Sequence, residues 1–275
     1  MTTHNIIELP FVSLILFIVM SLVSWAFLLA SSDMNVALSV DALYSSWDFV
    51  KRLLGSGSNG TPVLISADSW YRSLSLGLKT LKMSVIAAGL ASLLAFITFV
   101  PASRNISVEG SSNFLSAGVF YLLRAIFTIS RSVPELIWAM LIVFIFTPGT
   151  LAGALALAIH NYGIIGRLAA EVVEDMDQRP ISSLRSSGAS SLQILFYCIV
   201  PEAMPRFLTY VLYRWEVVIR TTVVVGFIAA GGLGRELRLN MSWFHYDEVG
   251  VILVSYILLV IMVDLISTVL RRLSR

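Results

Sequence analysis

The stretch PISSLRSSGASSLQILFYCIVPEAMPRF, residues 180–207, interrupts a chain that is otherwise mostly apolar. Its apolar residues recur at roughly helical spacing, while serines and Gln193 occupy positions between them. Gly188 lies in the middle, where it weakens a continuous helix and favours a bend. Pro201 and Pro205 are expected to interrupt the start of the next helix. The stretch therefore predicts a helix, a bend and a second helix at a membrane surface, flanked by spanning segments.

The composition predicts an integral membrane protein. Hydrophobic residues make up 57% of the 275 residues and charged residues 13%, and the mean hydropathy is +0.85. A soluble domain carries roughly 25% charged residues, because its surface must be hydrated. The net charge of +2 comes from scattered arginines, which argues against a nucleic-acid partner.

The chain offers little of the chemistry that enzymes and metal sites require. Its single cysteine, Cys198, excludes an intrachain disulfide, and three dispersed histidines lack metal-ligand spacing. No Walker sequence and no nucleophile–base arrangement occurs. We therefore expect no catalytic residue, no metal and no cofactor on this chain, and expect any ATP hydrolysis to occur on a partner.

Six apolar segments are long enough to cross a hydrocarbon core of about 30 Å. They are residues 11–30, 70–100, 114–146, 150–170, 208–230 and 249–270. The first is interpreted as a retained anchor, since no Lys or Arg precedes it and it is longer than a signal-peptide core. The third contains Pro134 and is expected to be one kinked crossing. The predicted fold class is an all-α integral membrane protein with about six transmembrane helices.

Two regions of different character divide the chain near residue 70. Residues 1–69 are predicted to hold the first crossing and an extracytoplasmic connector, in which 41–54 form an amphipathic surface helix. Residues 70–275 are predicted to form the membrane core, with a cytoplasmic loop at about 171–206. Alanines and glycines in 150–170 favour close helix packing.

The charges of the connecting segments predict the orientation. Six crossings put both termini on one side, and an internal N-terminus leaves eight arginines inside against five Lys and Arg residues outside. This bias predicts cytoplasmic termini and a cytoplasmic position for the stretch 180–205.

Charged residues within the predicted crossings are costly, and such residues usually pair or face a cavity. Arg131 with Glu135, and Glu216 with Arg220, are four residues apart and can form ion pairs within one helix. Such pairs either stabilise the bundle or line a path or gate for an anion. The arginine surplus suits a phosphate-like anion, because guanidinium presents a planar fork to its oxygens. The candidates for the path or gate are Arg124, Arg131, Glu135, Arg214, Glu216 and Arg220.

The tetrapeptide GGLG at residues 231–234 predicts a tight turn at a helix end. Gly231, Gly232 and Gly234 are the glycines expected to supply backbone with positive φ. No strand precedes the tetrapeptide and no P-loop lysine follows it, so it does not match a dinucleotide-binding fingerprint.

The stretch around Gly188 resembles the coupling loop of binding-protein-dependent ABC importer permeases. Gly188 is followed by nine residues, then by Cys198, Ile199 and Val200, and then by Pro201. The family's acidic-Ala-Ala before the glycine is replaced here by the residues SSL at 182–184. The resemblance implies that an ATPase subunit contacts Arg185, Gly188, Ala189, Leu192 and Pro201.

Further segments resemble the permease subunit of phosphonate ABC importers, including the related phosphite and phosphate-ester transporters. They are RSVPELIWA at 131–139, YRWEVVIRTTVVVGFIAAGGLG at 213–234, and residues 264–272. The resemblance covers about residues 70–275 and implies a type I importer fold in a bacterial inner membrane. It also implies two ATP-binding subunits carrying ATP and Mg, a periplasmic or lipid-anchored binding protein, and a second permease copy, identical or a close paralogue.

Two alternatives remain open from the sequence. A permease for methionine or another small solute shares the coupling loop, although not RSVPE and YRWE together. A non-ABC secondary transporter is expected to show an internal repeat, and none is seen.

Overall fold

The computed structural model describes residues 5–30, 39–55, 63–107 and 114–273. Within these ranges every regular element is helical. The chain divides into two compact units, Met1–Gly57 and Ser58–Arg275. The division falls earlier than the boundary predicted at residue 69.

The first unit contains two helices, α1 (Asn5–Ala30) and α3 (Val40–Leu53). Ser39 caps α3, because its hydroxyl accepts a hydrogen bond from the amide of Ala42 at 3.2 Å. Lys51 lies 5.9 Å from the centre of the Trp47 ring and 3.6 Å from Asp48. The amphipathic helix expected at 41–54 is thus present, shifted by one residue.

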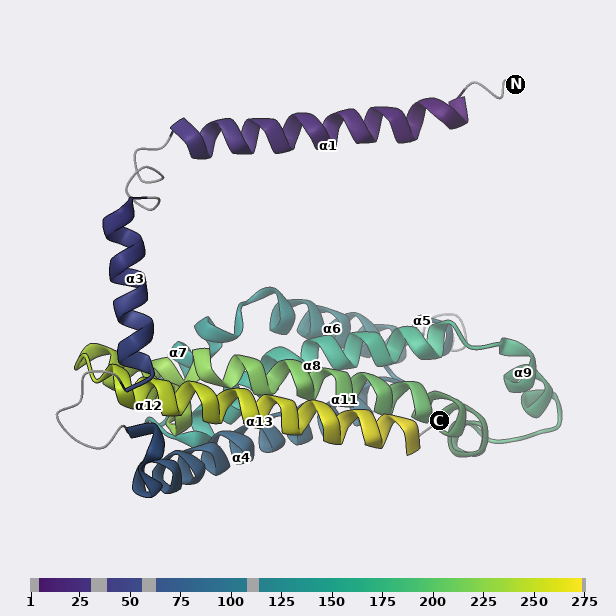
Figure 1. The fold of residues 1–275 in the computed structure, drawn as a ribbon. Coiled ribbons are helices and arrows are strands. Elements are labelled where there is room, and N and C mark those ends of the chain that lie inside the picture. Colours follow the sequence, from purple (N-terminus) through teal and green to yellow (C-terminus); the bar gives the residue numbers. More distant parts are fainter. Residues whose placement is uncertain (1–4, 31–38, 56–62, 108–113, 274–275) are drawn as a thin grey trace. The chain divides into compact units, whose positions relative to one another are not determined.

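The second unit is a bundle of long helices with short helices at both ends. Figure 1 shows α4, α8, α11 and α13 running alongside one another, with α9 at one end and α12 at the other. We call the end with α9 the hairpin end and the end with α12, which begins at Gly232, the glycine end. The elements are η1 (Val63–Ile65), α4 (Ala67–Thr98), α5 (Arg104–Ser107), α6 (Phe114–Ser132), α7 (Glu135–Ile145), α8 (Thr150–Glu174), α9 (Gln178–Ser186), α10 (Ser191–Ile194), η2 (Leu195–Ile199), α11 (Val200–Val225), η3 (Gly226–Ala230), α12 (Gly232–Ser242) and α13 (Tyr246–Leu273).

Helix α8 is the centre of the bundle and contacts α4, α6, α7 and α11. Its small residues let the neighbouring backbones approach, as the sequence predicted. A Cβ added to Gly166 would lie 2.5 Å from the ring of Phe127, and one added to Gly163 would lie 2.6 Å from the Phe127 carbonyl oxygen. Phe127 itself is fully buried. Close packing of α6 on α8 therefore depends on these two glycines.

The segment 114–146 is two helices, α6 and α7, and the break predicted at Pro134 is confirmed. Pro134 ends the first helix, because it cannot donate to the backbone ladder and it restricts Val133. Two backbone oxygens that the break leaves without helical partners contact side chains instead. The Trp138 indole donates to Ser130 O at 3.0 Å, and His160 Nδ1 lies 2.9 Å from Val133 O. The break is therefore stabilised by contacts from α7 and α8.

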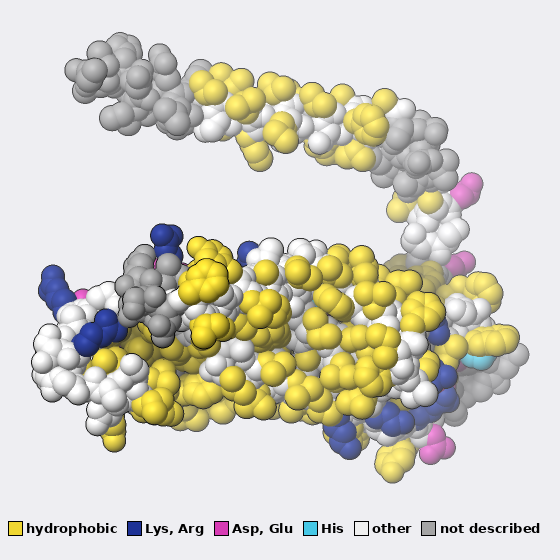
Figure 2. Space-filling model, turned by 180° about the vertical axis from the view of Figure 1, so that it is seen from behind, with side chains coloured by type: hydrophobic (Ala, Val, Ile, Leu, Met, Phe, Trp, Pro, Cys, Tyr) yellow, Lys and Arg dark blue, Asp and Glu magenta, His cyan; other side chains and the backbone are white. Residues whose placement is uncertain are grey.

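The predicted number of crossings is confirmed. Five of the described helices are long and apolar enough to span a membrane, namely α1, α4, α6, α8 and α13. The run Ser191–Ile228 and the helix Gly232–Ser242 meet at a bend of 49° and provide a sixth span if the pair is one crossing. Figure 2 shows hydrophobic side chains over the middle of the bundle and basic side chains gathered toward its two ends.

Candidate functional site

The bend predicted at Gly188 is the tip of a helical hairpin formed by α9 and α10. Gly188 has φ +84°, a conformation that suits glycine because it has no Cβ. The amide of Ala189 donates to Leu184 O at 3.0 Å and closes the end of α9. Ser190 then forms a capping box with Gln193 at the start of α10. The hairpin geometry is therefore specified by residues within the hairpin itself.

Three isoleucines attach the hairpin and the following turn η2 to the bundle. Ile181, Ile194 and Ile199 are buried in a cluster with residues from α4, α8 and α11. On the outer side, Arg185, Gly188 and Leu192 are exposed and Ala189 is half-buried. Gly188 and Ala189 line a surface hollow of about 400 Å³.

Pro201, the fifth residue expected to contact an ATPase, is exposed at the start of α11, beyond η2. The structure thus places the other four coupling candidates on the hairpin tip and Pro201 apart from them. The expectation that Pro201 and Pro205 interrupt this helix is wrong, because α11 continues from Val200 to Val225 through both. The wider π-turn of η2, which contains Tyr197, precedes Pro201. This turn relieves the clash between the proline ring and the carbonyl four residues earlier.

Neither ion pair expected within a helix is formed. Arg131 is exposed in the last turn of α6, whereas Glu135 begins α7 beyond the break at Pro134. The turn that would bring residues four apart together is missing there. Glu135 Oε2 instead lies 3.2 Å from His160 Nε2.

Glu216 and Arg220 each pair with α13 rather than with each other. Glu216 lies 2.5 Å from Arg271, and Arg220 lies 2.8 Å from Asp264. The hydroxyl of Tyr256 also donates to Arg220 O at 2.8 Å. Contacts between neighbouring helices thus replaced the intrahelical pairs, because α13 brings opposite charges directly alongside α11.

Arg124 joins α6 to the end of α8. Its guanidinium forms an ion pair with Glu174, and Nε donates to Ala102 O at 2.8 Å. The same Glu174 carboxylate accepts the amide of Arg104 at 2.7 Å. These contacts indicate that Arg124 stabilises the half of the bundle next to the hairpin end, which we call the hairpin half.

A polar layer crosses the middle of the bundle at adjacent positions of α8, His160 and Asn161. Arg214 on α11 donates twice to Asn161 Oδ1, at 3.0 and 2.7 Å, and the Asn161 amide donates to Leu157 O at 2.7 Å. His160 Nδ1 lies 2.9 Å from Val133 O, and its Nε2 lies 3.2 Å from Glu135 Oε2. The layer therefore combines a guanidinium held by Asn161 with a glutamate side chain beside an imidazole.

The glycines of GGLG have two different roles. Gly231 (φ +83°) and Gly232 (φ +70°) adopt the left-handed region, whereas Gly234 lies inside α12. A Cβ on Gly234 would lie 2.3 Å from Val223 O. The expectation that Gly234 supplies positive φ is therefore wrong, and it allows α12 to lie against α11 instead.

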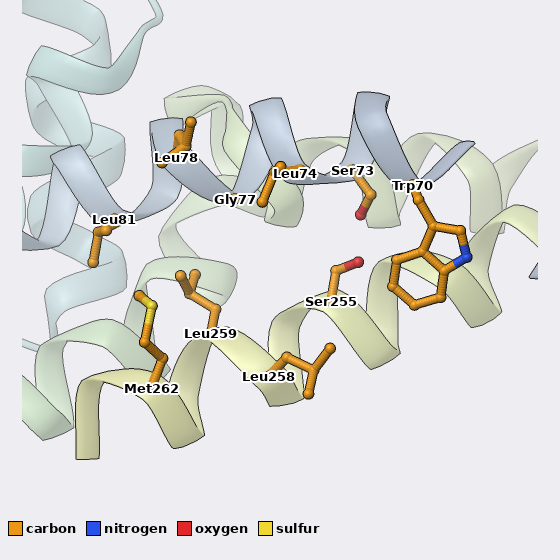
Figure 3. A pocket seen from close by; sticks show the side chains of 10 residues that line it. All are labelled: Trp70, Ser73, Leu74, Gly77, Leu78, Leu81, Ser255, Leu258, Leu259 and Met262. Atoms are coloured by element: carbon orange, nitrogen blue, oxygen red, sulfur yellow. The ribbon is translucent and has the colours of Figure 1, made fainter. Parts of the chain in front are cut away.

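A groove between α4 and α13 is almost wholly apolar (Figure 3). Its volume is about 220 Å³, and Trp70, leucines and Met262 surround it. Ser73 and Ser255 supply its only hydroxyl groups. Such a lining does not suit an anion, which requires charged or hydrogen-bonding groups.

Several residues of these sites were not found from the sequence. His160 and Asn161 are adjacent polar residues in the middle of the alanine-rich segment 150–170. Polar residues within a membrane crossing usually have a function, and this position was the signal in the sequence that could have identified them. Glu174 and Arg271 lie just beyond apolar segments and Asp264 lies within one, and none of the three is among the residues expected to line the path or gate. In the described part of the chain, no group of three or more His, Cys, Asp or Glu side chains could hold a metal ion.

The architecture defines the class of protein. The fold matches a solved structure titled as inward-facing conformations of the MetNI methionine ABC transporter, with a TM-score of 0.65 and 18% identity. The match covers 77% of this chain and 100% of the other. The chain is therefore a multi-pass membrane protein with the type I ABC importer permease fold, as predicted.

Sequence similarity then gives the family. The chain belongs to the family of binding-protein-dependent transport system inner membrane components, whose model matches residues 113–275. It is 34% identical to a phosphite transport system permease protein of Stutzerimonas stutzeri over 204 residues, 74% of this chain and 70% of the relative. A second relative from that organism, a putative phosphite transport system permease protein, is 32% identical over 70% of this chain and 66% of its own length.

Proposed function

We propose that this chain is the permease subunit of an ABC importer that moves phosphite, a phosphonate or a related phosphorus oxyanion across a bacterial inner membrane. The observation that carries the proposal is the similarity to a phosphite permease over 74% of the chain. The likeness to the methionine transporter, at 18% identity, concerns the fold alone.

The polar layer supports an anionic substrate. Arg214 is a cation inside the bundle, and among the described residues the neutral Asn161 is the one that its guanidinium hydrogen-bonds. We assign the path to Arg214 and to Glu135, whose Oε2 lies 3.2 Å from His160 Nε2. Arg124 and Glu216 are engaged in pairs that join helices, so we assign them a structural role. Arg131 is exposed, and Arg220 is exposed although it pairs with Asp264 of α13; we place both toward a second permease copy.

The hairpin supports coupling to an ATPase. Its tip projects at one end of the bundle, as Figure 1 shows for α9, and carries exposed Arg185 and Leu192. We propose that two ATP-binding subunits, holding ATP and Mg, dock on the hairpins of two permease copies, identical or closely paralogous. A periplasmic or lipid-anchored binding protein then delivers substrate at the glycine end. This arrangement requires a cytoplasmic hairpin and cytoplasmic termini.

Reconstitution tests the substrate and the energy source together. The chain, its ATPase and its binding protein are placed in proteoliposomes, and uptake of phosphite, methylphosphonate and methionine is measured with and without ATP. We expect ATP-dependent uptake of the phosphorus oxyanions. Uptake of methionine instead, or phosphite uptake driven by a proton gradient without the ATPase, would refute the proposal.

A matched pair of leucines tests the hairpin. Leu192 on α10 and Leu43 on α3 are similarly exposed, at 67% and 63%. We expect Leu192→Glu to abolish co-purification with the ATPase and ATP-dependent uptake, while Leu43→Glu preserves both. Normal uptake by Leu192→Glu at normal expression would contradict the docking site.

A further inference from the structure

An open cavity of about 580 Å³ lies at the glycine end, outside the polar layer and the hairpin. Residues of α4, the turn before α8 and the start of α12 line it. Three of them are cationic, Lys79, Lys82 and Arg235, and one is acidic, Glu236. Both lysines of α4 thus lie at this cavity.

The positive charges of the cavity are not neutralised by the described part of the chain. Glu236 is already engaged in an ion pair with Arg72. Within the described residues, the side chains of Lys79, Lys82 and Arg235 form no ion pair and no hydrogen bond. Lys79 and Lys82 are three residues apart on α4, so their like charges destabilise the empty site. Two of the three lysines in the chain line this one cavity.

Two helix N-termini add to the same positive field. Gly149 and Thr150 begin α8, and Gly231 and Gly232 begin α12, and all four line the cavity. No side chain caps either helix, and neither has an acidic residue in its first turn. Arg235 instead places a cation in the first turn of α12, where the helix dipole disfavours it. An anion in the cavity would relieve this arrangement.

The cavity wall is built by tertiary contacts that fix α12 against α4. Leu233 N donates to Thr80 Oγ1 at 2.9 Å, and a Cβ on Gly232 would lie 2.5 Å from the same oxygen. This contact holds Arg235 on the same cavity as Lys79 and Lys82, more than 150 residues away in the chain. A site positioned by buried backbone contacts is preorganised for a ligand.

We propose that this cavity binds a phosphorus oxyanion, such as phosphite or phosphate, at the outer end of the permease. The inference rests on the proposed function for the identity of the ion. Ammonium groups and helix N-termini are both phosphate-binding elements. The glycine wall admits a small ion close to the backbone, which favours a small solute over the acidic surface of a macromolecule.

Direct binding provides the test. The permease–ATPase complex, without binding protein, is placed in nanodiscs of phosphatidylcholine and titrated with sodium phosphite, and the midpoint of thermal unfolding is followed. We expect phosphite to raise the wild-type midpoint in a saturable, salt-sensitive manner. Replacing both lysines (Lys79→Gln with Lys82→Gln) should weaken the apparent affinity about tenfold or more. Lys51→Gln and Arg238→Gln are the controls outside the cavity and should bind as wild type does.

Two further arms identify the source of the oxyanion and exclude a docking surface. If phosphatidylglycerol in the nanodisc stabilises the wild type but not the double variant, and free phosphite stabilises neither, the site holds a lipid headgroup and a solute site is refuted. If the double variant binds phosphite normally but loses stimulation of ATP hydrolysis by the binding protein, the cavity is a docking surface and the inference fails.

Transport separates this inference from the proposed function. Wild-type uptake of phosphite with a raised KM in the double variant supports both. Wild-type uptake with unchanged binding and KM in the double variant refutes only the cavity site. Phosphite binding that depends on the two lysines, in a complex that imports no phosphorus oxyanion, supports the cavity and refutes the proposed function.

Discussion

The hairpin end and the glycine end of the bundle turn at glycines of similar backbone conformation in opposite surroundings. Gly188 has φ +84° and an added Cβ would meet nothing within 4 Å, whereas Gly232 has φ +70° and its Cβ would lie 2.5 Å from Thr80 Oγ1. The two ends also differ in whether their charged side chains are paired. In the hairpin half, Arg124 and Arg271 pair with Glu174 and Glu216. At the glycine end, three cations surround a cavity. The hairpin end projects toward a partner, while the glycine end is shaped around a space.

The largest expected effect concerns the paired arginines of the hairpin half. Glu174→Gln leaves Arg124, whose side chain is 11% exposed, without its counter-ion. Breaking a buried pair from one side costs about 3–5 kcal/mol, and denaturant titration of the detergent-solubilised chain measures this loss. Adding Arg124→Met should recover much of the stability.

The matched control for this prediction lies one turn away on α8. Glu171 pairs with Arg167 in a half-exposed i,i+4 pair, with side chains 40% and 35% exposed. Glu171→Gln should cost less than about 1 kcal/mol. Equal losses for Glu171→Gln and Glu174→Gln would show that burial does not separate the two pairs.

The packed glycine gives the second effect. Gly232→Ala combines the cost of a left-handed residue with a contact that the Thr80 side chain must relieve, for a loss of about 3 kcal/mol in unfolding free energy. Gly118→Ala on α6 is the control, because its Cβ would meet nothing within 4 Å. A loss below that of Gly188→Ala would contradict the comparison of the two turns.

The open glycine gives a smaller effect on stability. Gly188→Ala meets no neighbour, so only its backbone conformation is strained and the loss should be about 1 kcal/mol. Gly188→Asn should lose less, because asparagine tolerates positive φ, whereas Gly188→Val should disrupt the bend. Co-purification with the ATPase is expected to follow the same order. Full docking by Gly188→Val would show that the bend is not required.

The smallest expected effect on stability is a gain, produced by giving the glycine end a carboxylate. Thr150→Glu places a negative charge in the first turn of α8 and beside the cavity cations, for a gain of about 0.5–1 kcal/mol. The same change should remove stabilisation by phosphite, and Thr150→Gln should alter neither property. Thermal unfolding with and without phosphite measures both. Undiminished phosphite stabilisation of Thr150→Glu would show that the anion binds elsewhere.

The sequence was informative wherever neighbours along the chain decide the structure. Ser190 and Gln193 form their capping box within one turn, and Gly188 supplies the bend at a position where an added Cβ would meet nothing within 4 Å. The apolar segments showed their membrane crossings for the same reason, because length and composition are local properties.

Where the sequence failed, distant segments decided the outcome. Helical spacing predicts only neighbours on one helix. It therefore predicted an ion pair between Glu216 and Arg220, whereas Glu216 pairs with Arg271 of α13. It also paired Arg131 with Glu135, although Pro134 ends the helix between them.

The sequence by itself determined that this is an all-helical membrane protein with about six crossings, a surface hairpin centred on Gly188 and the family to which it belongs. Only the tertiary structure decided which charges meet. The orientation of each helix about its axis depends on packing against the others, here through the small residues of α8. That packing brought Arg214 to Asn161. It also gathered Lys79, Lys82 and Arg235 around one cavity, because a contact between Thr80 and Leu233 holds α12 against α4.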